Sequence, residues 1–140
     1  MIENLFEYFK EPQEFYLDKV SYRRIETENP IQSYYINCAD KIEVFLQEDR
    51  VRITVERTLT LEPKAKFELA VSYGAILKFD DDKKHEYDWK KINLAKEFQE
   101  NGEFVLSNLM SRMSLLIAEI TASFGQTPIV LPPGIAPANN

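Results

Sequence analysis

Two neighbouring stretches in which apolar and polar residues alternate constrain the fold of this chain most. Residues 51–61 place Arg, Thr and Glu on one face, and on the other face lie Val51, Ile53, Val55, Leu59 and Leu61. Residues 67–79 alternate in the same way after the turn sequence "EPKAK". Successive side chains of a strand point to opposite faces, so each stretch predicts a strand of an antiparallel sheet with one covered face.

A third strand is indicated over residues 15–24, but its apolar phase slips. Phe15 and Leu17 fall on one face, whereas Val20 and Tyr22 fall on the other. Such a slip predicts either a β-bulge or a strand with two partly covered faces.

The segment between these strands is less regular. A turn is expected at residues 26–30, and the aromatic segment 33–38 fits no clear period. Residues 42–46 alternate and lead through "QEDR" into the next strand, so they predict the fourth strand.

Helical patterns flank the strands. Apolar residues at helical spacing predict a short helix over residues 2–10, a second one over 89–102 and a long one over 104–124. The second is expected to end at Gly102 and the third at Gly125. Strands that come first and helices that follow indicate an α+β domain, with helices packed on one face of an antiparallel meander.

The long helix divides into faces on a helical wheel. Large apolar side chains form the face expected to cover the sheet: Leu109, Met110, Met113, Leu116, Ile117, Ile120 and Phe124. Small residues form a second, narrow face: Ser107, Ser111, Ser114, Ala118, Ala122 and Gly125. Small residues at this spacing allow another helix to pack closely. A chance run of small solvent-facing residues has the same pattern, so this face is expected either in an oligomer interface or in solvent.

The composition excludes several classes of partner. A formal net charge of −6 and a sequence pI near 4.9 argue against binding to nucleic acid or anionic lipid, which requires clustered Lys and Arg. The N-terminal sequence does not resemble a signal peptide, and no stretch approaches the ~20 apolar residues of a membrane span. With one cysteine, Cys38, the chain cannot form an internal disulfide, and we expect a cytoplasmic protein.

Residues that could carry chemistry are few. The one histidine, His85, is far in sequence from Cys38, and no third group points to a catalytic arrangement. Asp80, Asp81 and Asp82 lack the spacing of a calcium loop, and four isolated glycines do not form a phosphate-binding loop. We therefore expect a protein that is not an enzyme and that uses no metal or cofactor.

Apolar residues exceed what a core of four strands plainly requires. The candidates for a polypeptide-binding groove are Tyr22, Tyr34, Tyr35, Ile36, Phe45 and Trp89. Exposed aromatic surface is typical of sites that hold another molecule. The same residues could instead cover the sheet edges and the N-terminal helix, and the sequence leaves both interpretations open.

The order of these elements and the closing sequence "SFGQTPIVLPPGIAP" resemble SecB, the bacterial export chaperone, and more closely the wider group of SecB-like proteins. The resemblance covers residues 13–137 of a single domain over 1–140, and residues 1–12 form an N-terminal helix extension. Its most specific element is a Gly-x-x-Pro-Φ-Φ-Leu-Pro-Pro pattern, here Gly125, Pro128, Ile129, Val130, Leu131, Pro132 and Pro133.

This resemblance implies a four-stranded antiparallel sheet covered on one face by the long C-terminal helix. It implies a homo-oligomer, a dimer of dimers in which the small-residue face is the seam between helices, and an apolar tail that lies back along the sheet. It also implies an apolar groove between sheet and helix that holds non-native polypeptide without ATP, or one dedicated client such as an antitoxin. The resemblance does not decide whether the protein serves in protein transport, in a toxin–antitoxin system or in neither. The alternatives are a carrier of a small apolar ligand, with its pocket beneath the long helix, and a structural oligomer without binding activity.

Overall fold

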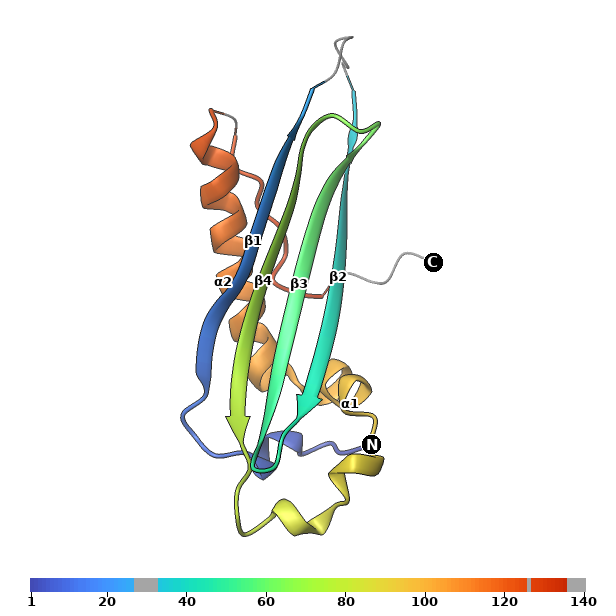
Figure 1. Ribbon diagram of the computed structural model, residues 1–140, viewed down its shortest axis with the longest axis vertical. Coiled ribbons are helices and arrows are strands. Elements are labelled where there is room, and N and C mark those ends of the chain that lie inside the picture. Colours follow the sequence, from blue (N-terminus) through green and yellow to red (C-terminus); the bar gives the residue numbers. More distant parts are fainter. Residues whose placement is uncertain (27–32, 126, 136–140) are drawn as a thin grey trace.

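The computed structural model describes residues 1–26, 33–125 and 127–135 of the chain. One antiparallel sheet contains four strands: β1 (Glu14–Ile25), β2 (Tyr35–Leu46), β3 (Arg50–Glu62) and β4 (Lys66–Lys78). One long helix, α2 (Glu103–Ser123), runs across one face of this sheet (Figure 1), which confirms the predicted α+β fold. We call the face covered by α2 the inner face and the opposite one the outer face.

The strand order is β1-β4-β3-β2, so the sheet is not the simple meander that the sequence predicts. β2, β3 and β4 follow one another, but β1 pairs with β4, and β1 and β2 form the two edges. This position brings the apolar face of β1 beside the helix, where the Arg112 guanidinium lies 4.8 Å from the centroid of the Phe15 ring. Apart from Glu26, the turn expected at 26–30 lies outside the described residues.

The core lies between the two central strands and α2. Val51 and Ile53 of β3 pair with Leu77 and Ala75 of β4, and none of the four has exposed surface. Arg52, between Val51 and Ile53, is half-buried on the outer face. The alternation is the one that the sequence predicts for both strands.

A bulge in β1 accounts for its slipped apolar phase. The register of β1 on β4 shifts between Leu17 and Lys19. Leu17 pairs with Tyr73 before the shift, and Val20 pairs with Val71 after it. Because directly paired residues share a face, the extra residue returns both apolar positions to the inner face. Of the two predicted alternatives, the bulge is therefore confirmed.

β2 begins at Tyr35, earlier than its alternating part indicates. Ile36 pairs with Leu61 on the inner face, whereas Tyr35 pairs with Glu62 on the outer face. Because apolar side chains project from both faces at this end of the strand, residues 33–38 show no period in the sequence.

The N-terminal helix is shorter than predicted and consists of one 3₁₀ turn, η1 (Leu5–Tyr8). Leu5 and Tyr8 are both buried, and residues three apart lie on the same side of a 3₁₀ helix, so one turn suffices to bury them. Phe9 follows in an isolated bridge with Phe79, and their ring centroids lie 5.0 Å apart. These residues cover the core at this end of the sheet.

The second predicted helix starts later than expected. Residues 84–86 and 89–91 form two 3₁₀ helices, η2 (Lys84–Glu86) and η3 (Trp89–Lys91), before α1 (Leu94–Asn101). α1 begins at Leu94 because Asn93 caps it: Asn93 Oδ1 accepts a hydrogen bond from the Lys96 N–H at 3.2 Å. It ends at Gly102, as predicted.

α2 buries one face against the sheet. The buried side chains are Val105, Leu106, Leu109, Met110, Met113, Ile117 and Thr121. Of the broad apolar face predicted from the sequence, Leu116 and Ile120 are only half-buried. Phe124 is 39% exposed, since it is the C-cap residue and leaves the helical phase. By length and composition α2 could cross a membrane, but its buried face belongs to the core of this domain.

Candidate functional site

The chain reverses direction at the end of α2. Gly125 has a φ of 82°, in the left-handed region that residues with a side chain rarely adopt. Residues 127–135, which we call the strap, then run back along the inner face of the sheet (Figure 1). The Ile129 N–H donates to Thr121 Oγ1 at 2.8 Å and ties the strap to α2. The prediction that the apolar tail lies back along the sheet is confirmed.

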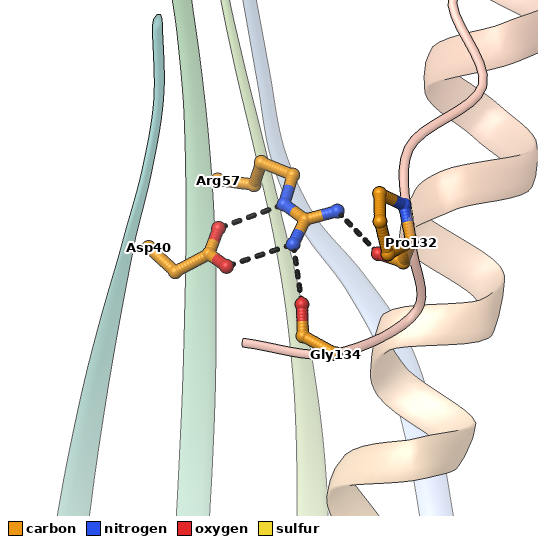
Figure 2. A network of polar contacts seen from close by, with 4 residues as sticks. All are labelled: Asp40, Arg57, Pro132 and Gly134. Carbon is orange, nitrogen blue, oxygen red and sulfur yellow. Dashed lines mark hydrogen bonds and ion pairs between the residues drawn. The ribbon is translucent and has the colours of Figure 1, made fainter. Parts of the chain in front are cut away.

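A buried ion pair holds the strap against the sheet (Figure 2). Arg57 of β3 and Asp40 of β2 are paired in the ladder, and their side chains are 2% and 0% exposed. Arg57 Nε and Nη2 each donate to one carboxylate oxygen of Asp40 at 2.8 Å. The guanidinium also donates from Nη1 to the Pro132 carbonyl oxygen at 3.1 Å and from Nη2 to the Gly134 carbonyl oxygen at 2.7 Å. One side chain thus joins two strands and the strap.

The geometry explains why two charges can be buried here. Removing an ion from water costs on the order of several kcal/mol unless its hydrogen bonds are satisfied. A two-pronged contact between guanidinium and carboxylate is the strongest arrangement for such a pair. The hydrogen bond to Asp40 raises the pKa of Arg57 above its ordinary value. Arg57 is therefore a fixed donor that faces main-chain carbonyl groups.

Neither member of this pair was predicted as a site residue, although a signal was present. Arg57 stands in the inward phase of β3, between Val55 and Leu59, where a charged residue needs a partner. Asp40 occupies the same phase as Ile42 in β2. Only the register of β2 on β3 shows that the two charges meet.

Three of the groove candidates meet at one end of the inner face, near the C-terminal end of α2. Tyr34 and Ile36 border a cavity of about 270 Å³, which the strap also lines. Tyr22 borders a second cavity of about 650 Å³. Lys66 and Phe67 line both cavities, so we describe the two together as the distal groove.

Aromatic rings line the distal groove, and Lys66 borders both of its cavities. The Tyr22 ring stacks on Phe67 with centroids 6.1 Å apart and lies 5.5 Å from the ring of Phe124. Lys66 Nζ lies 4.7 Å from the centroid of the Tyr34 ring, within the range of a cation–π contact. The backbone of Lys66 has a φ of 59°, a left-handed conformation that costs a residue with a side chain about 1–2 kcal/mol. Strain of this kind concentrates at ligand-binding sites.

The other three candidates lie elsewhere. Tyr35 lies on the outer face and is 78% exposed. Phe45 lies on the same face and is 43% exposed, with its ring centroid 4.9 Å from the Arg52 guanidinium. Trp89 is buried at the opposite end of the sheet, with its ring centroid 5.0 Å from that of Phe79. The period of two in β2 separates Tyr35 from Ile36, and no local pattern marks Trp89 as a core residue.

Cys38 and His85 do not form a catalytic pair. Cys38 is paired with Leu59 on the inner face, whereas His85 borders a cavity with Leu46, eight positions further along β2. Eight residues of strand span on the order of 25 Å. Burial raises the pKa of the Cys38 thiol, which disfavours the reactive thiolate. Within the described part of the chain, no three His, Cys, Asp or Glu side chains meet as metal ligands.

The small-residue face of α2 remains accessible to another molecule. Ser107, Ser111, Ala122 and Gly125 are exposed, and Ser114 and Ala118 are half-buried. Leu115 lies on the same side of the helix and is 63% exposed. A role of this face in assembly stays a prediction.

Comparison with solved structures identifies the fold as that of SecB-like chaperones. The chain matches a SecB-like chaperone of Mycobacterium tuberculosis, solved in complex with a ChAD peptide from the HigA1 antitoxin. The TM-score is 0.69 at 12% sequence identity, over 91% of this chain and 92% of that chain. A protein of unknown function from Streptococcus agalactiae matches with a TM-score of 0.49 at 12% identity, over 89% of this chain and 98% of that chain. No protein-family model and no curated protein matches the sequence. The resemblance to SecB-like proteins is thus confirmed at the level of the fold.

Proposed function

We propose that this protein is a chaperone or adaptor that binds a non-native segment of another polypeptide in the distal groove, without ATP. One observation carries the proposal: exposed apolar side chains meet around two adjoining cavities. Tyr22 is 46% exposed, Ile36 is 44% exposed and Phe124 is 39% exposed. Clustered apolar surface of this kind marks interaction sites. The complex of the Mycobacterium tuberculosis chaperone with an antitoxin peptide supports a polypeptide as the ligand.

The groove suits an extended chain with several large apolar side chains. Its cavities, of about 650 and 270 Å³, are both lined by Phe67 and can receive side chains from neighbouring parts of one segment. Burial of apolar surface contributes roughly 25 cal/mol per Å² and needs no nucleotide. Lys66, between the cavities, can pair with a carbonyl or carboxylate oxygen of the bound chain. Selection then depends on apolar content more than on an exact sequence.

The proposal extends to client and assembly. We propose in addition a dedicated client such as an antitoxin and a cytoplasmic location. We also propose a dimer of dimers that is joined through the small-residue face of α2. The net charge of −6 disfavours nucleic acid as a partner. Catalysis is not part of the proposal, because partial burial raises the pKa of the Cys38 thiol and disfavours the reactive thiolate.

Suppression of aggregation tests the proposal with a matched pair of variants. Purified protein at stoichiometric ratio, without nucleotide, should reduce light scattering by a chemically unfolded, unrelated protein. Tyr34→Ser should weaken this effect severalfold, because Tyr34 lines the groove. Tyr35→Ser should leave it unchanged, because Tyr35 projects from the outer face. No suppression at a severalfold excess, or equal loss in both variants, would contradict the proposal.

A second candidate function rests on a different cavity. Leu46, Phe79, Tyr87 and Trp89 border a space of about 820 Å³ at the far end of the sheet, a size suited to a small molecule. This space favours a carrier of a small apolar ligand, although it does not lie beneath the long helix, where Met113 and Ile117 are fully buried. Native mass spectrometry that detects a small ligand on protein inactive in the aggregation assay would favour the carrier.

A further inference from the structure

The strap is seated on the inner face in the manner of a bound peptide. Ile129 and Leu131 are half-buried against the core, whereas Val130 between them is 77% exposed. This alternation of inward and outward side chains is that of an extended chain lying on a surface. Its polar contacts to the body come from the Ile129 N–H and the carbonyl oxygens of Pro132 and Gly134.

Arg57 recognises the strap through main-chain atoms alone. Its two contacts are to the carbonyl oxygens of Pro132 and Gly134, which every residue type carries. The guanidinium is held by both oxygens of Asp40, so its orientation does not depend on the strap. If the strap leaves, the N–H groups that it occupied can donate to other acceptors, while Asp40 keeps the guanidinium in place. Carbonyl oxygens of another extended chain would satisfy them.

The strap also forms a wall between separate cavities. Thr127 and Ile129 border the cavity that contains Tyr34. The other end of the strap, with Pro133, Gly134 and Ile135, borders a cavity of about 540 Å³ against α2. Displacing the strap would join these spaces into one channel that starts in the distal groove and passes Arg57.

We propose that the strap is an intramolecular competitor of the client, and that a client segment replaces it on Arg57. The inference rests on the proposed function, because it assumes that the distal groove binds polypeptide. The inner face then offers a longer binding site than the distal groove alone. The free protein keeps that site closed with its own chain.

Weakening the strap should therefore tighten client binding. The variant Ile129→Ser/Leu131→Ser removes the two inward apolar contacts, and Val130→Ser is the matched control on the outward position. The probe is fluorescently labelled, reduced and carboxymethylated α-lactalbumin, which cannot refold. Since the apparent Kd scales inversely with the fraction of open molecules, we expect the double variant to bind up to about tenfold more tightly. The control should bind as the wild type does.

Two further measurements do not depend on the affinity of the probe. Alkylation of Cys38, the only cysteine and two positions from Asp40 on the same face, should be faster in the double variant than in the wild type. A synthetic peptide of residues 127–135 added to the double variant should compete with the probe and slow this alkylation. The same peptide with serine in place of Ile129 and Leu131 should do neither.

The outcomes separate the inference from the proposed function. A double variant that binds the probe no more tightly than the wild type, or less tightly, overturns the inference and leaves the strap as a wall of the groove. A wild type and a double variant that both fail to bind the probe overturn the proposed function, and the inference with it. If the double variant does not fold, failure of the 127–135 peptide to compete for the wild-type protein overturns the inference.

Discussion

Replacing Arg57 by Met should reduce the stability of the whole domain. The variant keeps the volume of the side chain but leaves the carboxylate of Asp40 buried without its cation. Removing one partner of a buried ion pair typically costs about 3–5 kcal/mol. The strap loses two donors as well, although Pro132 and Gly134 are exposed and water can reach their carbonyl groups. We expect a loss of about 4 kcal/mol in the free energy of unfolding, a large part of the roughly 5–15 kcal/mol of a typical domain.

The double variant Asp40→Leu/Arg57→Met provides the control. It removes both charges, and apolar replacement of a buried pair is often neutral or stabilising. We therefore expect its free energy of unfolding to lie within about 1–2 kcal/mol of the wild-type value. This is far from the sum of the losses expected for Asp40→Leu and Arg57→Met alone.

Urea unfolding measures these free energies, with fluorescence of the single tryptophan, Trp89, as the probe. With a slope of about 2 kcal/mol per molar urea, the Arg57→Met midpoint should fall by about 2 M. A loss below about 1 kcal/mol in the single variant would refute the description of a buried, mutually dependent pair. A double variant as unstable as the sum would refute it equally.

Two further predictions concern the sheet and the helix. A Cβ at Gly74 would lie 2.2 Å from Cζ of Tyr16, so Gly74→Ala should displace that ring and cost about 1 kcal/mol of stability. In a Tyr16→Ala background the same change should be neutral or stabilising by about 0.5–1 kcal/mol. Thermal melting of the four proteins checks this change of sign. Ala118→Leu adds bulk to the small-residue face of α2 and should convert a tetramer into dimers, because overpacking of about 1–3 kcal/mol recurs in every copy. Light scattering coupled to size exclusion measures the mass, and an unchanged mass would place this face in solvent.

Much of the fold could be predicted because its signals are local. The period of two placed β3 and β4, and the slipped phase of β1 corresponded to a real bulge between Leu17 and Lys19. Gly102 and Gly125 marked the ends of α1 and α2, because a Cβ at Gly102 would lie 2.2 Å from the Phe98 carbonyl oxygen and Gly125 has a left-handed φ of 82°. The position of β1 beside β4 could not be predicted from turns, because it depends on contacts between distant segments.

The candidate site could be predicted only in part. Tyr22, Tyr34 and Ile36 were identified by their apolar character, and the structure brings them together in the distal groove. The same criterion also selected Tyr35, which the pleat of β2 turns to the outer face. Arg57 escaped it altogether, because a charged residue in an apolar phase is understood only when its partner on another strand is known.

The contact of Arg57 with carbonyl oxygens has a consequence for the evolution of the strap. A side chain that recognises only main-chain atoms does not restrict which amino acids follow one another at positions 132 and 134. Substitutions there can accumulate while the path of the chain is retained, provided that the backbone stays extended and Arg57 and Asp40 are kept as a pair. Homologues with unrelated strap sequences should therefore be recognisable by an Arg and an Asp in the inward phases of two adjacent strands, a signal that survives when overall identity does not.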